Sequence, residues 1–373
     1  AEDPEDAPLI EDRGAPQAAP QLAVLLGLGE RIAIGVAVLT TGGATRDLPR
    51  PLPGQTGDID QPFPHRYSGV QLRYRRRTLL AGAALRASSW LGVGVSLALS
   101  QVRMDETRHI WAGTPGLDEM GGELSEDLVL SVSGDDDIVP GVSLGVLIAP
   151  PEAPVEMAMA ASYTMNAELE GTADLQTLTS NPFPLPELSQ PGARTELAVP
   201  LVIRAGLRYL GERFLLEAGA ELAVHLADAP VWQLSGVSVR NANQMTGAIS
   251  ELSALVQPRD HGALRLAADV EIAPGFLWLS AGYAYRSAAS DPDRPSPVSS
   301  DRGGHTLAIG AEGYWNGMTL TIGYSRTLTP TQTTSASEVV MIAPFDPAIT
   351  TVGEGRYGGS RDTFGAAVEI AWE

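Results

Sequence analysis

Charged residues recur at intervals of four in two neighbouring stretches of this sequence. Arg204 and Arg208 lie in one stretch, and Glu217 and Glu221 lie in the next. A guanidinium group can bind a carboxylate through two parallel hydrogen bonds, so Arg204 and Arg208 are candidates for holding the head group of a carboxylic acid. The same spacing also fits a structural interpretation, in which arginines and glutamates on adjacent strands neutralise one another.

Catalytic chemistry would have to use the five histidines of the chain. No Gly-x-Ser-x-Gly turn and no His-Glu-x-x-His pair accompanies them, and these are the spacings that supply a nucleophile or a zinc site. Asp135, Asp136 and Asp137 are adjacent, without the alternating spacing of a dedicated cation loop, and we expect a bulge or a kink of the strand at Gly134–Asp137 instead. The sequence therefore predicts a protein that is not an enzyme and carries no metal or other cofactor.

The elements that position these side chains follow a regular rhythm. About thirteen stretches of roughly 9–11 residues alternate apolar residues with small or polar ones, which is the length and period of a tilted strand crossing a membrane. The gaps between the stretches alternate between short and long, and we expect the long ones, residues 40–66, 103–124, 171–193, 227–260, 288–304 and 330–360, to be loops. Short periplasmic turns and long outer loops are typical of a bacterial outer-membrane barrel, so we predict an all-β, transmembrane, antiparallel β-barrel in the cell outer membrane.

The last stretch shows the alternation most plainly. Phe364, Ala366, Val368, Ile370 and Trp372 share one face, which we expect to meet lipid, while small residues and Glu369 share the other.

Composition narrows the class of protein further. The chain has 373 residues, no cysteine and a net charge of −20. The acidic balance argues against nucleic acid as a partner. No run of 18 apolar residues exists, so a helical membrane span is not expected.

The number of strands predicts a missing piece. Single-chain bacterial barrels usually have an even number of strands, and thirteen strands fit a fourteen-strand barrel that lacks one. We expect residues 1–20 to be an acidic, Pro-rich extracellular segment and residues 21–373 to form the barrel. Unpaired strand edges are costly in lipid, so we expect an N-terminal plug with one strand, or a partner chain, to complete the sheet. Direct pairing of Gln21–Leu28 with Thr363–Trp372 is the alternative.

Within this barrel the charged residues fall on the inward faces. We predict a ligand-binding set in the lumen that comprises Arg204, Arg208, Arg265 and His225. Polar barrel interiors are the rule, which favours a structural ladder of ion pairs over a ligand clamp.

A second basic group consists of Arg73, Arg75, Arg76 and Arg77, which interrupt the apolar alternation. We place it at the extracellular rim. It is either a site for lipopolysaccharide phosphates or a solvated extension of the strand.

Several segments resemble the FadL-type outer-membrane transporters of long-chain fatty acids and hydrocarbons. Leu130–Asp135 followed by Gly141–Leu147 looks like the kinked middle strand of that family, and Pro200–Tyr209 is similar to a later strand. Gly282–Ser287, before a Pro-rich loop, resembles the late hairpins. The resemblance covers strands two to fourteen of the family, without its plug and first strand.

The resemblance implies an outer-membrane channel that takes up hydrophobic small molecules, such as long-chain fatty acids or hydrocarbons, through its lumen. The alternative is a barrel of this type that serves as a structural subunit of a cell-envelope or secretion assembly. The sequence leaves both open.

Overall fold

The computed structural model describes residues 10–49, 64–113, 126–178, 184–227, 229–299, 301–346 and 351–371, so Trp372 lies outside the described residues. Within these ranges the chain is almost all antiparallel β-structure with one short 3-10 helix, η1. None of the described helical structure is long and apolar enough to span a membrane. The elements are β1 (Gln21–Leu28), β2 (Ile32–Asp47), η1 (Pro64–Ser68), β3 (Gln71–Arg86), β4 (Leu91–Trp111), β5 (Asp127–Ile148), β6 (Val155–Thr164), β7 (Ala167–Thr177), β8 (Leu185–Leu197), β9 (Leu201–Leu210), β10 (Phe214–Val224), β11 (Val231–Arg240), β12 (Thr246–Ala248), β13 (Glu251–Ser253), β14 (His261–Ala273), β15 (Leu277–Arg286), β16 (Gly304–Trp315), β17 (Met318–Thr334), β18 (Val339–Val340), β19 (Thr351–Val352) and β20 (Gly355–Ile370).

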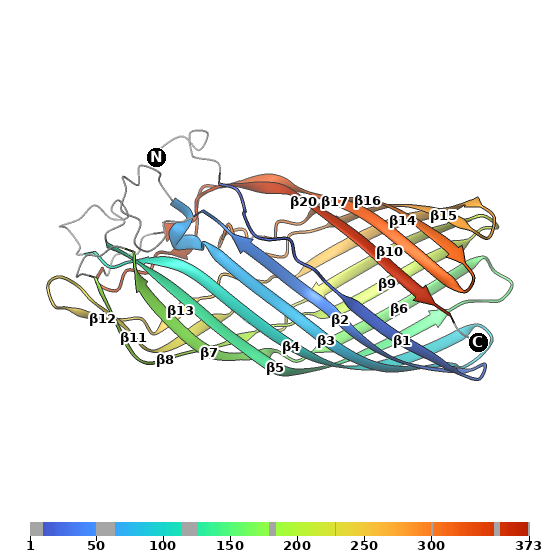
Figure 1. Ribbon diagram of the computed structural model, residues 1–373, viewed down its shortest axis with the longest axis horizontal. Coiled ribbons are helices and arrows are strands. Elements are labelled where there is room, and N and C mark those ends of the chain that lie inside the picture. Colours follow the sequence, from blue (N-terminus) through green and yellow to red (C-terminus); the bar gives the residue numbers. More distant parts are fainter. Residues whose placement is uncertain are drawn as a thin grey trace.

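The strands form one long tilted wall, with tight turns at one end and the long connections at the other (Figure 1). Neighbours in sequence pair antiparallel, as β1 does with β2 and β16 with β17. Three wall strands are each split by a short break, which gives the pairs β6–β7, β8–β9 and β10–β11. A fourth is split into β12, β13 and β14, which pair in turn with β11 and β10. When a split strand is counted once, the described residues contain thirteen wall strands. The predicted barrel and its strand number are confirmed.

The register separates an outer from an inner face. Ala218 lies opposite Leu266 on β14 and Leu207 on β9, so these three side chains share one face. Leu207 and Leu266 are exposed on that face, as apolar side chains that meet lipid are. The alternating faces follow from the period of two along each strand. The outward residues of β6, β10 and β14 carry no charge, as a lipid-facing surface requires.

Many strands continue beyond the predicted membrane span, where the sequence suggested loops. β4 runs on to Trp111, β7 to Thr177 and β17 to Thr334. The expectation of long loops over residues 103–124, 171–193 and 330–360 was therefore wrong over a good part of those ranges. These strand extensions exist because their inward side chains pack together. We call this region the crown; it comprises η1, β7, β8, β11–β13 and the ends of β2–β5 on the same side.

The crown encloses an apolar core inside the wall. Trp232 and Leu128 are fully buried at its centre, and Leu72, Met104 and Leu169 pack with them. Each belongs to a different strand, so the core ties β3, β4, β5, β7 and β11 together. Burial of this kind stabilises a fold by roughly 1.5–3 kcal/mol for each large side chain. The crown is therefore a packed body rather than a set of mobile loops.

A row of irregularities separates the crown from the membrane part of the wall. The pairing of β2 with β3 shifts at Thr41, and Asp137 and Ile138 of β5 stand opposite the single residue Gln101 of β4. The breaks at residues 165–166 and 198–200 interrupt the next two wall strands. One extra residue moves the following side chains to the other face of the strand. The bulge predicted at Gly134–Asp137 is confirmed, within one continuous strand.

The first and last strands each pair on one side only within the described part of the chain. β1 pairs with β2 and β20 pairs with β17, with no pairing between β1 and β20. All residues of β1, and residues 358–370 of β20, are exposed. We call the gap between these two edges the seam. Among the residues that the structure describes, the direct pairing that would close an odd barrel is not present.

Candidate functional site

One wall of the lumen carries an ordered row of ion pairs. Arg204 Nε lies 2.7 Å from Glu221 Oε2, and Arg265 Nη2 lies 3.1 Å from the same oxygen. Arg208 Nη2 lies 2.6 Å from Glu217 Oε1. Together with Glu156, whose carboxylate lies 3.7 Å from Arg208, these residues form what we call the Arg–Glu ladder.

The ladder follows directly from strand register. Glu221 stands opposite Arg204, and Glu217 stands opposite Arg208, in the antiparallel pairing of β9 with β10. Directly opposed side chains in a sheet lie about 5 Å apart at Cβ, close enough for long side chains to meet. The arginines remain about half exposed to the lumen, so each pair is weak in isolation. The ladder contacts agree with the structural interpretation, while the carboxylate clamp stays a prediction.

His225 does not lie in the ladder. It follows β10 at the base of the crown, with its Nδ1 3.7 Å from Asp260 and its ring 6.1 Å from that of His261. The backbone N–H of His225 donates a hydrogen bond to Asp260 Oδ1. Of the four residues predicted to bind ligand, the structure therefore brings together Arg204, Arg208 and Arg265. In the described ranges no group of three or more metal-ligating side chains is arranged around one point.

The opposite wall of the lumen is almost without charge. On β1–β5 the register places small and apolar residues on the inner face of the membrane part, with Arg86 at the turn end as the charged exception. The inward residues are Ala23, Leu25, Gly27, Ala33, Gly35, Ala37, Leu39, Leu80, Gly82, Ala84, Gly94, Ser96, Ala98, Gly141, Ser143, Gly145 and Leu147. The lumen therefore has one neutral wall and one charged wall. A molecule with an apolar body and a polar end could satisfy both.

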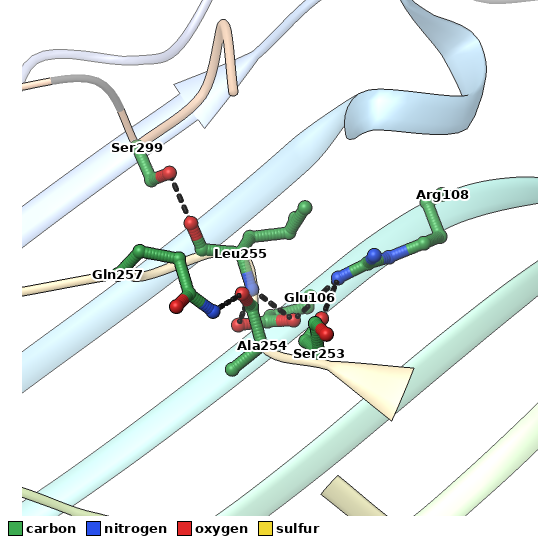
Figure 2. A network of polar contacts seen from close by, with 7 residues as sticks. All are labelled: Glu106, Arg108, Ser253, Ala254, Leu255, Gln257 and Ser299. Atoms are coloured by element: carbon green, nitrogen blue, oxygen red, sulfur yellow. Dashed lines mark hydrogen bonds and ion pairs between the residues drawn. The ribbon is translucent and has the colours of Figure 1, made fainter. Parts of the chain in front are cut away.

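The crown closes the lumen above, and a buried polar contact holds part of it in place. The segment after β13 enters the crown, where the backbone N–H of Leu255 donates hydrogen bonds to both carboxylate oxygens of Glu106, at 2.9 and 3.0 Å (Figure 2). Arg108 Nη2 donates to the carbonyl oxygen of Ser253 at 2.7 Å and lies 3.3 Å from Glu106 Oε2. Ser299 Oγ donates to the carbonyl of Leu255 from the other side.

Both charges of this contact are buried, which makes the contact sensitive to protonation. Burial raises the pKa of the Glu106 carboxyl, and the nearby Arg108 opposes that rise. Burial also lowers the pKa of the Arg108 guanidinium. Sequence reasoning missed both residues because they fell in a predicted loop. Glu106 and Arg108 lie at every second position between Met104 and Ile110, which is the spacing of one strand face. This spacing is the signal that could have found them.

The predicted basic rim is divided between the two faces of the wall. Arg73, Arg75 and Arg77 are exposed on the outer face of β3, next to the crown. Arg76 points the other way, because it shares its face with Leu72 and Thr78, which are buried. Arg76 therefore faces the inside of the barrel, since alternate residues of a strand point to opposite faces, and the placement of the four arginines at the extracellular rim stays a prediction.

One hollow of the described surface lies outside the lumen. It has a volume of about 1050 Å³ and is lined by Met157, Met159, Leu207, Leu264 and Tyr283, among others. The register places all five on the outer face. We therefore assign this hollow to the lipid-facing surface and not to a substrate path.

Comparison with proteins of known structure identifies the fold of this barrel. No protein-family model matches the sequence, and no curated protein sequence matches it. Solved structures do match. A Pseudomonas aeruginosa FadL homologue superimposes with a TM-score of 0.65 at 15% identity, covering 94% of this chain and 76% of its own. The CymD monoaromatic hydrocarbon channel gives 0.59 at 16% identity, with 86% and 81% covered. The Ralstonia pickettii toluene transporter TbuX gives 0.56 at 14% identity, with 84% and 76% covered. The chain therefore has the barrel fold of the FadL-type family that its sequence resembles.

Proposed function

We propose that this protein is an outer-membrane channel for the uptake of hydrophobic small molecules. The observation that carries the proposal is the neutral inner wall along β1–β5, which faces a lumen whose other wall bears the Arg–Glu ladder. A channel for ions or sugars has polar groups all round, whereas small apolar residues along one side let an apolar molecule slide without losing contacts. The similar structures include channels described as carrying toluene and monoaromatic hydrocarbons, which supports the same class of ligand.

The proposed route begins at the crown. A ligand arriving from outside meets the packed crown core, so the segment around Leu255 has to move before the lumen is reached. From the lumen the ligand leaves sideways through the wall or past whatever fills the lower part of the barrel. In this proposal Arg204, Arg208 and Arg265 bind the polar end of a ligand, through the face of each guanidinium left free by the ladder. His225, which lies apart from them at the base of the crown, is proposed as a separate contact for the ligand.

Reconstituted vesicles test the proposal. Purified protein in lipid vesicles should speed the transfer of a labelled alkane such as hexadecane across the membrane. Glucose, of similar or smaller size, should pass no faster than it passes protein-free vesicles. Rapid glucose passage, or no acceleration of the alkane, would contradict a hydrophobic channel. Replacing both Arg204 and Arg208 with Gln should weaken the binding of a fatty acid more than that of an alkane of equal length if the two arginines bind a carboxylate. If they serve only as a ladder, the binding of both ligands should change equally.

We also propose that a further strand fills the seam. Backbone N–H and C=O groups left unpaired in lipid cost several kcal/mol each, so an open edge along β1 and β20 is unfavourable. The occupant is an N-terminal plug and strand of this protein, or a strand of a partner chain. The second case is the structural-subunit function, and the two free edges are the observation that keeps it as a candidate. Native mass spectrometry of the gently extracted protein distinguishes a bound fragment, a partner chain and bound lipid by mass.

A further inference from the structure

The outer face of β3 carries three arginines in a row. Arg73, Arg75 and Arg77 lie at every second position of the strand and are exposed. Arg76, which lies between them in sequence, faces inward and donates hydrogen bonds to two hydroxyl groups inside the wall. Each residue of a strand advances the chain by about 3.3 Å, so the three outward side chains are spread over about 13 Å. We call Arg73, Arg75 and Arg77 the arginine stripe.

The stripe begins where the apolar outer surface ends. From Leu79 to Leu85 the outward residues of β3 are leucine and alanine, and Leu79 stands opposite the exposed Leu99 of β4. With a strand tilt of about 40°, the stripe spans roughly 10 Å along the membrane normal. The polar layer on each side of a bilayer is about 5–8 Å thick. The stripe therefore crosses the head-group layer on the crown side, and Arg73 stands above the height of an ordinary phospholipid head group.

The charges around the stripe are distributed unevenly. One row of the register crosses the outer face of the crown through Gly43, Arg75, Arg103, Asp135, Glu170 and Arg194. Both carboxylates of this row stand between Arg103 and Arg194, whereas Arg75 has a glycine on one side and Arg103 on the other. Like charges directly opposite each other in a sheet are destabilising. An anion that bridges Arg75 and Arg103 would therefore relieve a repulsion within the wall.

The guanidinium groups of the stripe are open to a ligand. Asp105 stands opposite Arg73, but its carboxylate lies 3.3 Å from Arg103 Nη2. In the part of the chain that the structure describes, the three arginines of the stripe form no ion pair and no side-chain hydrogen bond. Arg194, on the acidic side of the same face, lies 2.7 Å from Glu168 instead. A guanidinium binds phosphate through two parallel hydrogen bonds, so each arginine of the stripe can hold one phosphate group.

We propose that the arginine stripe, with Arg103 beside it, binds the phosphate groups of lipopolysaccharide in the outer leaflet. The length of the stripe favours a lipid with a tall saccharide head group and more than one phosphate over a phospholipid with a single phosphate. The acyl chains have a place directly below the stripe, along the exposed Leu79, Leu97 and Leu99. This inference rests on the outer-membrane placement in the proposed function and is independent of the molecule that the channel carries.

Titration of two lipids tests the proposal. Lipid A with two phosphates and phosphatidylglycerol with one can each be added to the purified full chain in detergent, and native mass spectrometry measures the bound fraction. The unaltered protein should bind lipid A at least about tenfold more tightly than phosphatidylglycerol, because more charge-assisted hydrogen bonds form. A variant that combines Arg73→Gln, Arg75→Gln and Arg77→Gln should lose at least about tenfold in its affinity for lipid A.

Two single variants form a matched pair. Arg75→Gln and Arg194→Gln remove the same charge from the same row of the outer face, but Arg194 lies among glutamates. Arg75→Gln should weaken lipid A binding about fivefold, and Arg194→Gln should leave it within about twofold. The heat-dependent shift in gel mobility of a folded barrel checks that each variant is assembled. Equal losses in the two variants would show a general effect of net charge and would overturn the proposal.

The remaining outcomes separate the possible ligands. Lipid A binding that survives in the triple variant, or phosphatidylglycerol binding as tight as that of lipid A, would overturn the proposal. Displacement of lipid A by millimolar inorganic pyrophosphate would assign the stripe to free phosphate and would overturn it as well.

The transfer of hexadecane across vesicles keeps this inference distinct from the proposed function. The triple variant should transfer hexadecane at the rate of the unaltered protein, because the stripe lies outside the lumen. Normal transfer without lipid A binding to the unaltered protein would overturn the lipid site and leave the channel standing. Lipid A binding without transfer would contradict the channel and support the lipid site.

Discussion

The carboxylate of Glu106 accepts hydrogen bonds from the backbone N–H of Leu255, which lies 149 residues further along the chain. This contact joins β4 to the segment that closes the crown. Glu106 and Arg108 are both buried, so neither charge has water as an alternative partner. Glu106 and Arg108 therefore hold two main-chain groups of this segment, the Leu255 N–H and the Ser253 carbonyl, beside the apolar core of the crown.

Glu106→Ala should open the crown locally. Removing one partner of a buried ion pair costs about 3–5 kcal/mol, because Arg108 is left charged and buried with the Ser253 carbonyl as its remaining acceptor. Hydrogen exchange at Leu252–Leu255 should accelerate, and exchange in the membrane part of β14 should not change. The control is Glu251→Ala, an exposed residue nearby. Equal acceleration in both variants would show that Glu106 does not hold the segment.

The stability of the crown should depend on pH through Glu106. Burial raises its pKa above the ordinary value of 4.5, so the closed crown binds this proton more tightly than an opened one. The contribution of Glu106 to the stability of the closed crown is then fully present below about pH 4.5 and is lost as the pH rises through the raised pKa. The fluorescence of Trp232, which is fully buried in the crown, should report the opening during denaturant titrations at several pH values. Glu106→Gln should flatten this dependence; an unchanged slope in that variant would assign it to another group.

A charge added to the two faces of β14 should have opposite effects. Leu266→Arg places a cation on the lipid-facing side, which costs about 2–4 kcal/mol near mid-membrane and should block assembly. Ala267→Arg places the same cation in the lumen, directly opposite Glu217, and should be tolerated. Heat-modifiable gel mobility measures the assembled fraction of each variant. Similar behaviour of the two variants would overturn the assignment of inner and outer faces.

The seam should keep β1 and β20 apart in the native membrane. A disulfide requires Cα atoms about 4.4–6.8 Å apart, whereas two strands separated by a third lie about 10 Å apart. The chain has no cysteine of its own, so a cysteine at Leu25 and one at Gly365 or Ala367 can be paired without background. We expect no disulfide under oxidising conditions. As a positive control, cysteines at Leu25 and Gly35, which are paired across β1 and β2, should link. Efficient linking of β1 to β20 would mean that the barrel closes on itself.

The sequence alone was enough for the architecture of the membrane part. The alternation along residues such as Leu264, Leu266 and Ala268 specifies which face meets lipid, because a strand has a side-chain period of two and charge is excluded from lipid. The opposition of Arg204 to Glu221 was also foreseeable, since a short turn between two strands sets their register. The odd strand number predicted the free edges of β1 and β20.

The tertiary structure decided the crown and the inner face of Arg76. Residues such as Glu106 and Leu255 are distant in sequence, and no local pattern indicates that a carboxylate will meet a backbone N–H on another segment. The run Arg73–Arg77 looked like a uniform rim because the residue types alone do not show to which face of the wall each side chain points. β3 continues unbroken through that run, so one arginine turns inward among hydroxyls while its neighbours face outward. A strand that extends beyond the membrane keeps its period of two, and that geometry, rather than residue type, decides which charges enter the lumen.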